Sequence, residues 1–400
     1  MPIHVPVVRT GNIVTPQFVP PRSIGVKVAA NSYVFDTTDD FFLPDIAPHL
    51  GTNVLATPRL VSAKFAGMHY HREVPTIHHA VARNLDLPGC MWYGVEPAAR
   101  GVYEWAALDA FVATAAAAGR DTVFNFLGTP NWAAARRTEP GHYSSGSDAE
   151  PANIDDLAAF ARAVCSRYRA LGTPITAFEV WNEPKYAGGG GVAQGNYFTG
   201  TPEALARMAR AVYQAVKGVD SKTLVLSPAP TGLEYAWVTG DRSGTDNLDL
   251  FMAASDGAGG SGRDWVDVVA FHSYSHDGYN NLFAIPQMVA NVRAVMALRG
   301  LSDRPIWITE TSAITPQLKS FVIQRQQEFI ARTLLLALGC GVDRVIWYAW
   351  DDGLGFHLQP AVARYWNDIT GLLAGATISL VNSLRNRRVA AVIDGKRHLI

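Results

Sequence analysis

Two short segments of this 400-residue chain consist of strand-forming residues that end at a glutamate. One reads Phe-Glu-Val-Trp-Asn-Glu-Pro over 178–184, and the other reads Pro-Ile-Trp-Ile-Thr-Glu-Thr-Ser over 305–312. Aromatic and β-branched residues favour strands, so we expect Glu183 and Glu310 to lie at the C-terminal ends of two buried strands. In a barrel of parallel strands, that end carries the catalytic groups. Two carboxyl groups meeting there, one protonated and one ionised, are the minimum that cleavage of a glycosidic bond requires.

Polar residues beside these glutamates extend the predicted site. Asn182 directly precedes Glu183, and its neutral amide can bind a sugar hydroxyl without altering the charge of the carboxyl group. After the sixth predicted strand the chain reads Phe-His-Ser-Tyr, which brings His272 and Tyr274 to the same rim. A tyrosine hydroxyl that donates to a carboxylate keeps it ionised, and we expect Tyr274 to do so for Glu310. For His272, a substrate contact and a packing role both stay open.

Aromatic and polar side chains near other strand ends could also contact a sugar. Trp350 ends the eighth predicted strand, where its ring face suits the C–H face of a pyranose, whereas Trp347 alternates to the other face and is expected to pack. Trp132 lies in a long loop after the third strand. His69 lies near the end of the first predicted strand. It could reach the sugar, or it could be a rim residue without a role. The substrate-binding residues predicted from the sequence are Asn182, His272, Tyr274, Trp350, Trp132, His69 and Asn125.

These residues need a framework that brings distant strand ends together, and short strand-like runs alternate with longer helical segments along the chain. That alternation is typical of βα units in a parallel sheet. Eight strands, the number that closes a barrel, are expected. They are Ala63–Tyr70, Met91–Val95, Thr122–Leu127, Ile175–Val180, Thr223–Ser227, Val266–Phe271, Pro305–Thr309 and Arg344–Trp350.

Helices are predicted between these strands, and their ends carry recognisable signals. Ile154–Leu171 has two aspartates in its first turn, where negative charge suits the helix dipole. Another helix begins after Thr201, with proline in its first turn. Gln287–Leu298 and Gln324–Leu338 supply two more. An open doubly wound sheet is disfavoured, because no glycine-rich phosphate loop follows the first strand.

The sequence therefore predicts an α/β protein, a (β/α)₈ TIM barrel with a small accessory β-region formed by the N- and C-terminal segments. Residues 1–60 form an N-terminal extension, residues 61–371 the catalytic barrel, and residues 372–400 a C-terminal β segment that packs with the extension. The long loops 128–149 and 184–201 lie at the rim that carries Glu183, and they favour a groove for an oligosaccharide over a pocket for one sugar.

Composition restricts the partners. Only 17% of the residues are charged and the formal net charge is −1, so the chain lacks the basic face that nucleic acid or anionic lipid requires. The three cysteines, Cys90, Cys165 and Cys340, are too scattered for a disulfide framework or a zinc cluster. No secretory signal is legible, so a cytoplasmic enzyme, a phage-associated enzyme and export by another route all stay open. The oligomeric state is not legible either.

The motifs together resemble those of clan A glycoside hydrolases. The segment 178–184 is similar to the strand-four signature of that clan, and Trp-Ile-Thr-Glu-Thr over 307–311 is similar to its strand-seven signature. Within the clan the chain looks most like glycoside hydrolase family 39 and its relatives that act on bacterial exopolysaccharides. Supporting segments are Tyr-Gly-Val-Glu-Pro over 93–97, Gly-Val-Tyr-Glu-Trp over 101–105, Leu-Asp over 108–109, Thr-Pro-Asn-Trp-Ala over 129–133 and Phe-His-Ser-Tyr over 271–274.

This resemblance implies a retaining glycosidase that cleaves an oligo- or polysaccharide by double displacement. Glu183 would be the acid/base, Glu310 the nucleophile, and Asn182 would touch the sugar at the cleavage site. It implies no cofactor and no metal. The first sixty residues match nothing in the family pattern.

Two other classes stay open. His69 and His71 form a His-x-His pair after the first strand, which is one way to hold the metal of a barrel hydrolase. The chain could alternatively be a carbohydrate-binding barrel without turnover. The sequence does not identify the sugar, its linkage, or the choice between endo and exo cleavage.

Overall fold

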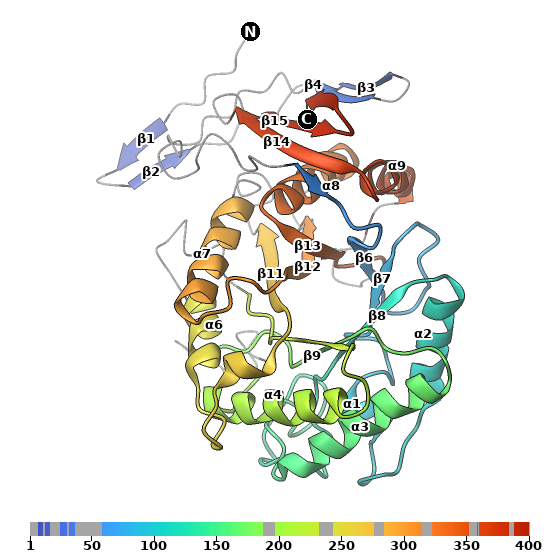
Figure 1. The fold of residues 1–400 in the computed structure, drawn as a ribbon, viewed down its shortest axis with the longest axis vertical. Coiled ribbons are helices and arrows are strands. Elements are labelled where there is room, and N and C mark those ends of the chain that lie inside the picture. The colour runs from blue at the N-terminus through green and yellow to red at the C-terminus, as the bar shows by residue number, and fades with distance from the viewer. Residues whose placement is uncertain are drawn as a thin grey trace.

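The computed structural model describes residues 58–186, 197–231, 243–275, 284–313, 322–351, 358, 360–383 and 388–399, together with four short strands before residue 37. The predicted barrel is confirmed. An eight-stranded sheet has the order β10-β9-β8-β7-β6-β13-β12-β11, and every pair within it is parallel. A parallel bridge between Leu226 and Val268 joins its two edges, so the sheet closes on itself (Figure 1). The strands are β6 (Ala66–His69), β7 (Val81–Arg83), β8 (Asp121–Asn125), β9 (Ala177–Glu179), β10 (Leu224–Leu226), β11 (Val269–Ser275), β12 (Ile306–Ala313) and β13 (Val342–Trp347).

One predicted strand is wrong. Met91–Val95 contributes a short helix, and the second barrel strand is β7, whose three residues the sequence pattern did not reveal. Strand-forming residues are overridden here by packing: Trp92 and Val95 are both buried on the helix. A Cβ on Gly94 would lie 2.9 Å from the Gly89 backbone, so this turn fits only with glycine.

Helices follow the strands around the barrel as the alternation predicted (Figure 1). The first turn of α4 is capped by the Thr201 hydroxyl, which accepts from the backbone of Ala204, and proline follows Thr201 as expected. Asn153 caps α3 in the same way. The helices are α1 (Trp92–Val95), α2 (Ala106–Ala117), α3 (Ile154–Ala170), α4 (Pro202–Lys217), α6 (Ser243–Ala253), α7 (Ala284–Leu298), α8 (Val322–Gly339) and α9 (Ala363–Leu373), with 3-10 turns η2 (Gly262–Trp265) and η3 (Pro360–Val362).

The core has two layers. Inside the barrel, small and branched side chains from the strands pack together, including Val81, Val123 and Ala177. A larger layer fills the space between the strands and the helices. In this outer layer Trp347 packs edge to face against Phe329, as the alternation along its strand predicted. Cys90 and Cys165 are buried free thiols.

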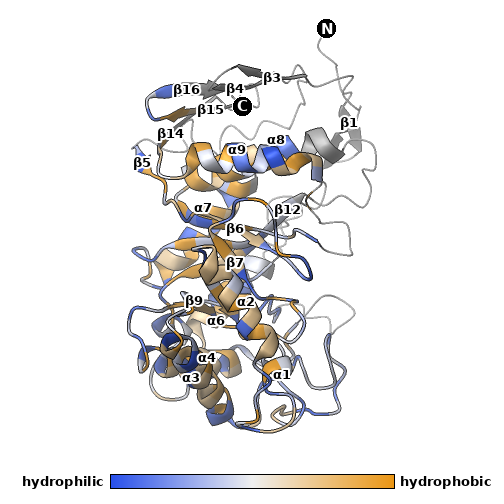
Figure 2. Ribbon diagram, turned by 90° about the vertical axis from the view of Figure 1, so that its right-hand side faces the viewer, coloured by the Kyte–Doolittle hydropathy of each residue, from blue (hydrophilic) through white to orange (hydrophobic). Residues whose placement is uncertain are grey.

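A small antiparallel sheet lies against one side of the barrel, next to α8 and α9 (Figure 2). Its order is β16-β15-β14-β5, so a strand that precedes the barrel pairs with strands that follow it. These strands are β5 (Arg59–Leu60), β14 (Thr377–Ser383), β15 (Arg388–Ile393) and β16 (Lys396–Leu399), and the earlier hairpins are β1 (Val7–Thr10) with β2 (Ile13–Pro16) and β3 (Gly25–Ala29) with β4 (Ser32–Asp36). Buried Ile378 and Ala391 join the core of the barrel, which ties the sheet to it. The domain boundaries at residues 60 and 371 stay predictions.

Part of the predicted loop 184–201 lies outside the described residues, namely 187–196. Within the residues that the structure describes, no helix is long and apolar enough to cross a membrane.

Candidate active site

Glu183 follows β9 on a backbone that bends sharply. Trp181 and Glu183 both have positive backbone φ angles, of 70° and 42°, which residues other than glycine rarely adopt. The surrounding chain holds this turn: the amide of Glu183 donates to the Ala229 carbonyl at 3.0 Å, and the Trp181 indole donates to the Tyr197 carbonyl at 2.8 Å. Strained backbone of this kind concentrates at functional sites, and here it turns the Glu183 side chain toward the barrel axis.

Glu310 lies within β12, and its carboxylate is almost completely buried. One of its oxygens accepts from the Arg83 guanidinium at 2.5 Å, and the other accepts from the Tyr274 hydroxyl at 2.7 Å. The structure therefore places Tyr274 where the sequence predicted it. Two donors on one buried carboxylate favour its charged form.

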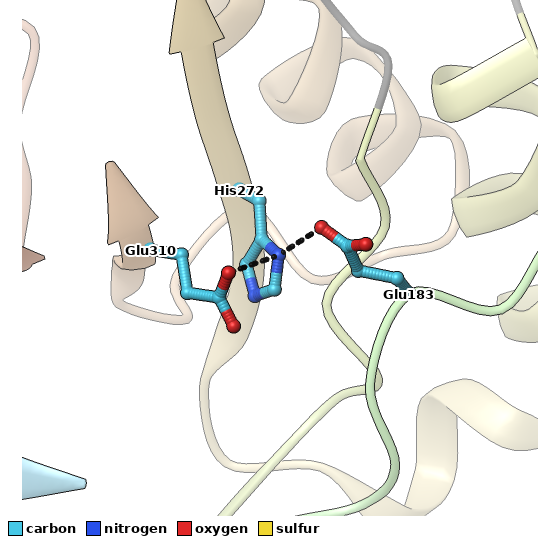
Figure 3. A group of neighbouring side chains, drawn as sticks. All are labelled: Glu183, His272 and Glu310. Carbon is cyan, nitrogen blue, oxygen red and sulfur yellow. Dashed lines mark hydrogen bonds and ion pairs between the residues drawn. The ribbon is translucent and has the colours of Figure 1, made fainter. Parts of the chain in front are cut away.

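His272 lies between the two glutamates (Figure 3). Its Nδ1 is 2.6 Å from an oxygen of Glu183 and 3.4 Å from an oxygen of Glu310. One atom from each of the three side chains lies within 4.8 Å of the others, so the carboxylates approach each other closely. The sequence left open whether His272 packs or acts, and the geometry joins it to both carboxylates.

The three side chains share their protons, because each pair is in direct contact. Burial lowers the pKa of His272. The charges of Glu310 and Glu183 together raise this pKa by more than burial lowers it, so the net shift is upward. Burial raises the pKa of Glu183, but the hydrogen bond with His272 and the positive charges of His272, Lys185 and Arg83 together outweigh burial, and the net shift is downward. For Glu310, burial raises the pKa more than the charges of His272 and Arg83 lower it. In the empty site a proton therefore resides on the His272 side of its bond with Glu183.

Arg83 connects several of the site residues through hydrogen bonds. It is completely buried at the end of β7, and it donates to Glu310, to Glu179 at 2.7 Å and to the Asn182 side-chain oxygen at 2.7 Å. Burial lowers the pKa of Arg83, but the charges of Glu179 and Glu310 raise it above its ordinary value. The guanidinium thus remains charged and links strands two, four and seven of the barrel.

Asn125 belongs to this network rather than to the surface of the site. Its amide donates to Glu179 at 2.8 Å and to the Trp181 carbonyl at 3.1 Å, and the residue is completely buried. The prediction of Asn125 as a sugar contact is not supported by this position. It holds Glu179 and the bent segment that precedes Glu183.

His69 is completely buried at the end of β6, and its Nε2 is 2.7 Å from the Leu85 carbonyl. Burial and the charge of Arg83 lower the pKa of His69 well below its ordinary value, so the ring is neutral. Nε2 therefore carries the hydrogen and donates to Leu85. The Nδ1 atom is left as a buried acceptor without a hydrogen-bond partner.

The two predicted aromatic contacts differ in position. The Trp350 amide donates to the His69 carbonyl at 2.7 Å, which holds this half-buried residue beside the first strand at the rim. The Trp132 indole donates instead to the Glu96 carbonyl at 2.8 Å, and this contact ties it to the end of α1.

Among the described residues, Glu183, His272 and Glu310 form the one group of acidic, histidine or cysteine side chains close enough to hold a metal ion. Arg83 already supplies a buried positive charge 2.5 Å from Glu310, which opposes a cation at that position. His69 and His71 do not belong to such a group, so the arrangement gives no support to the metal-dependent alternative.

The fold and the site define a TIM barrel with two glutamates at the C-terminal ends of its strands. No protein-family model matches the chain, and no curated protein matches it. Its fold is similar to that of a glucosidase from Croceicoccus marinus, with 14% identity and a TM-score of 0.58 over 85% of this chain and 77% of that one. It is also similar to a family 39 glycoside hydrolase from Bacteroides cellulosilyticus WH2, with 18% identity and a TM-score of 0.58 over 84% and 69% of the chains. A GH39 β-xylosidase from Caulobacter crescentus gives 18% identity and a TM-score of 0.57 over 85% and 79%. At identities this low, the comparisons establish a shared fold alone.

Sequence reasoning missed Arg83, Glu179 and Asp86. Arg83 was missed because the second strand was predicted at Met91–Val95, whereas the actual strand β7 is only three residues long. Glu179 stands inside the predicted strand and alternates with apolar neighbours, so a buried acid facing the barrel interior was legible there. Asp86 accepts from the hydroxyls of Tyr143 and Tyr348, and nothing in the sequence pairs it with these distant residues.

Proposed function

We propose that this protein is a retaining glycoside hydrolase of clan A, related to family 39, that cleaves an oligo- or polysaccharide. The observation that carries the proposal is the approach of Glu183 and Glu310, whose nearest oxygens lie within 4.8 Å across His272. Retaining enzymes hold their two carboxyl groups about 5–5.5 Å apart, whereas inverting enzymes need about 6.5–9.5 Å to admit a water molecule. The observed separation supports the retaining class.

In the proposed reaction, Glu310 attacks the anomeric carbon while Glu183 gives a proton to the departing glycosidic oxygen. The glycosidic bond breaks and a covalent bond forms between the sugar and a Glu310 oxygen. Glu183, now ionised, then removes a proton from water, which attacks the same carbon and frees Glu310. Both steps keep the overall charge of the site constant.

Glu183 must be protonated at the start, and His272 can supply that proton across the 2.6 Å contact. When substrate excludes water, a neutral acid beside a neutral imidazole costs less than a buried ion pair. We infer that the proton moves from His272 to Glu183 as substrate binds. Arg83 and Tyr274 meanwhile face Glu310 with donors and keep its negative charge oriented.

Asn182 lies beside this pair with a defined orientation. Its side-chain oxygen accepts from Arg83 at 2.7 Å, so its NH₂ group is turned away from Arg83 and is available to a sugar hydroxyl. The proposed substrate is an oligo- or polysaccharide, because a long loop at residues 128–149 follows the third barrel strand at this rim. A bacterial exopolysaccharide is the class that the family resemblance favours.

The test is a panel of aryl glycosides and polysaccharides, followed by Glu183→Gln and Glu310→Gln. We expect each substitution to lower kcat/KM by about a thousandfold or more, because each removes a group that acts on the reacting atoms. Glu203→Gln is the matched control, since Glu203 is exposed on α4. A protein that binds polysaccharide with unchanged affinity in all three variants, and that has no activity to lose, would instead be the carbohydrate-binding alternative.

A further inference from the structure

A second group of polar and aromatic side chains lies at the rim, and the proposed reaction does not use it. The Asp86 carboxylate accepts from the Tyr143 hydroxyl at 2.5 Å on one oxygen and from the Tyr348 hydroxyl at 3.1 Å on the other. The Nε2 atom of His71 is 3.8 Å from the second oxygen. We call Asp86, Tyr143, Tyr348 and His71 the Asp86 cluster.

The Asp86 cluster adjoins the nucleophile. Tyr348 packs against Tyr274, whose hydroxyl donates to Glu310. The Tyr348 ring also lies 4.8 Å from the ring of His69, measured between centroids. The cluster therefore reaches Glu310 through Tyr348 and Tyr274, on the side where the sugar that becomes bonded to Glu310 must lie.

The chemistry of the cluster is that of an acceptor site. Within the described part of the chain, His71 is the one basic side chain within 4.0 Å of Asp86, and its Nε2 has no hydrogen-bond partner. The buried Nδ1 of His69 is a further acceptor without a partner. The Asp86 side chain keeps 29% of its surface exposed, so a ligand can reach it.

Aromatic rings form the wall around this carboxylate. Tyr143 stacks on Tyr93 at a centroid distance of 5.4 Å, and the His71 ring meets the Tyr348 ring edge to face at 5.4 Å. Aromatic rings beside a carboxylate attract cations, because ring faces carry partial negative charge. A ligand group that suits both features is positively charged and rich in hydrogen-bond donors.

We propose that the Asp86 cluster is a sugar subsite on the glycone side that selects a sugar with a free, protonated amino group. The inference rests on the proposed glycosidase function and narrows its substrate to polymers that contain a de-N-acetylated amino sugar. An ammonium group offers three donors and a positive charge to Asp86. A uronic acid would instead bring a second carboxylate toward Asp86, and an acetamido group would remove the charge.

The test measures binding to the wild-type protein by calorimetry, so it does not depend on turnover. The probes are glucosamine tetrasaccharides in β-1,4 and β-1,6 linkage, the N-acetylglucosamine tetrasaccharides of the same linkages, and cellotetraose as a neutral sugar. At about pH 6, where a sugar amine is charged, we expect at least one glucosamine probe to bind about tenfold more tightly than its acetylated or neutral counterparts. The preference should disappear at about pH 9, where the amine is neutral, and should weaken with added salt.

Asp86→Asn tests the residue itself, because the amide keeps the size of the side chain and removes its charge. We expect this variant to bind the three kinds of probe with similar affinity. Asp368→Asn removes the same charge from a half-buried position on α9 and should keep the wild-type preference. A general attraction between a cationic sugar and the carboxylates of the protein would change equally in both variants.

The proposal is overturned if the acetylated or neutral probes bind as tightly as the amines, if neither amine probe binds, or if the preference survives in Asp86→Asn. The comparison among probes on the wild-type protein holds even where Asp86→Asn folds poorly. The glycosidase function is tested separately. If that function fails, the wild-type protein will show no hydrolysis that is lost in Glu310→Gln.

Discussion

At the residue scale, the charge of Glu310 is set by three neighbours in direct contact. Arg83 and Tyr274 donate to its two oxygens, and His272 lies 3.4 Å away. The hydrogen bond from Tyr274 lowers the pKa of Glu310, while burial raises it. Each neighbour can be removed by substitution, and each removal should move the pH dependence of activity in a defined direction.

Tyr274→Phe removes one donor from Glu310 and leaves the ring in place. Without that hydrogen bond the pKa of Glu310 should rise, so ionised Glu310 appears only at higher pH. We expect the acidic limb of the pH profile of kcat/KM to move to higher pH, and kcat to fall by about tenfold to a hundredfold. A pH–rate profile of both proteins measures the shift. An unchanged acidic limb would show that Tyr274 does not act on the charge of the nucleophile.

Residues of this kind differ in how well the sequence predicts them. Glu183 and Tyr274 stand at the ends of clear strand runs, so residue type and local pattern were enough to place them at the rim. Arg83 ends a strand of only three residues and Asp86 follows that strand, and the partners of both are far away in the chain. Such contacts arise from barrel closure, which no local pattern records.

At the element scale, one buried arginine joins three strands. Arg83 at the end of β7 contacts Glu179 at the end of β9 and Glu310 within β12. Its charge is balanced by two carboxylates, and both Arg83 and Glu179 are completely buried. The missed strand β7 therefore contributes the positive charge on which the predicted strands depend.

Glu179→Gln removes one of these two carboxylate charges without changing the shape of the side chain. Breaking a buried pair leaves an uncompensated charge, so we expect a loss of about 3 kcal/mol in the free energy of unfolding, measured with urea. Arg83 would then act more strongly on Glu310 and lower its pKa. The acidic limb should move to lower pH, opposite to Tyr274→Phe, which a purely structural role for Glu179 would not produce.

At the scale of the whole molecule, a barrel and a small antiparallel sheet share one continuous core. The alternation of strands and helices was enough to predict the barrel, because seven of the eight expected strands overlap those in the sheet. The β-character of the C-terminal segment 372–400 was legible too, because β14, β15 and β16 all lie within it. The pairing of β5 with β14 joins residues more than 300 positions apart, and local patterns do not specify it.

The stability of the whole fold in acid should depend in part on His79. Burial lowers the pKa of His79 to about 4, from an ordinary value of 6.5. Between about pH 6.5 and about pH 4, His79 is therefore protonated in the unfolded chain but neutral in the folded protein. The neutral histidine contributes its full stability above about pH 6.5, and up to about 3 kcal/mol is lost as the pH falls through this window.

His79→Asn keeps a neutral donor near the Ile77 carbonyl, which lies 3.0 Å from Nδ1 in the protein. We expect the variant to be less stable than the wild type at about pH 7.5 and to lose less stability between about pH 6.5 and pH 4. Urea unfolding across this range measures both slopes. Parallel slopes for the two proteins would mean that His79 does not govern the acid sensitivity.

The most direct test of the central claim is to trap the sugar on the protein. The glycoside that is cleaved fastest in the panel would be prepared as an activated 5-fluoro derivative, which keeps the substituent at C2 and slows release of the covalent intermediate. Peptide mass analysis should then find one added sugar on the peptide that contains Glu310, and none in Glu310→Gln. A label on Glu183, or hydrolysis that proceeds with inversion and leaves no label, would contradict the assignment of Glu310 as the nucleophile and Glu183 as the acid/base.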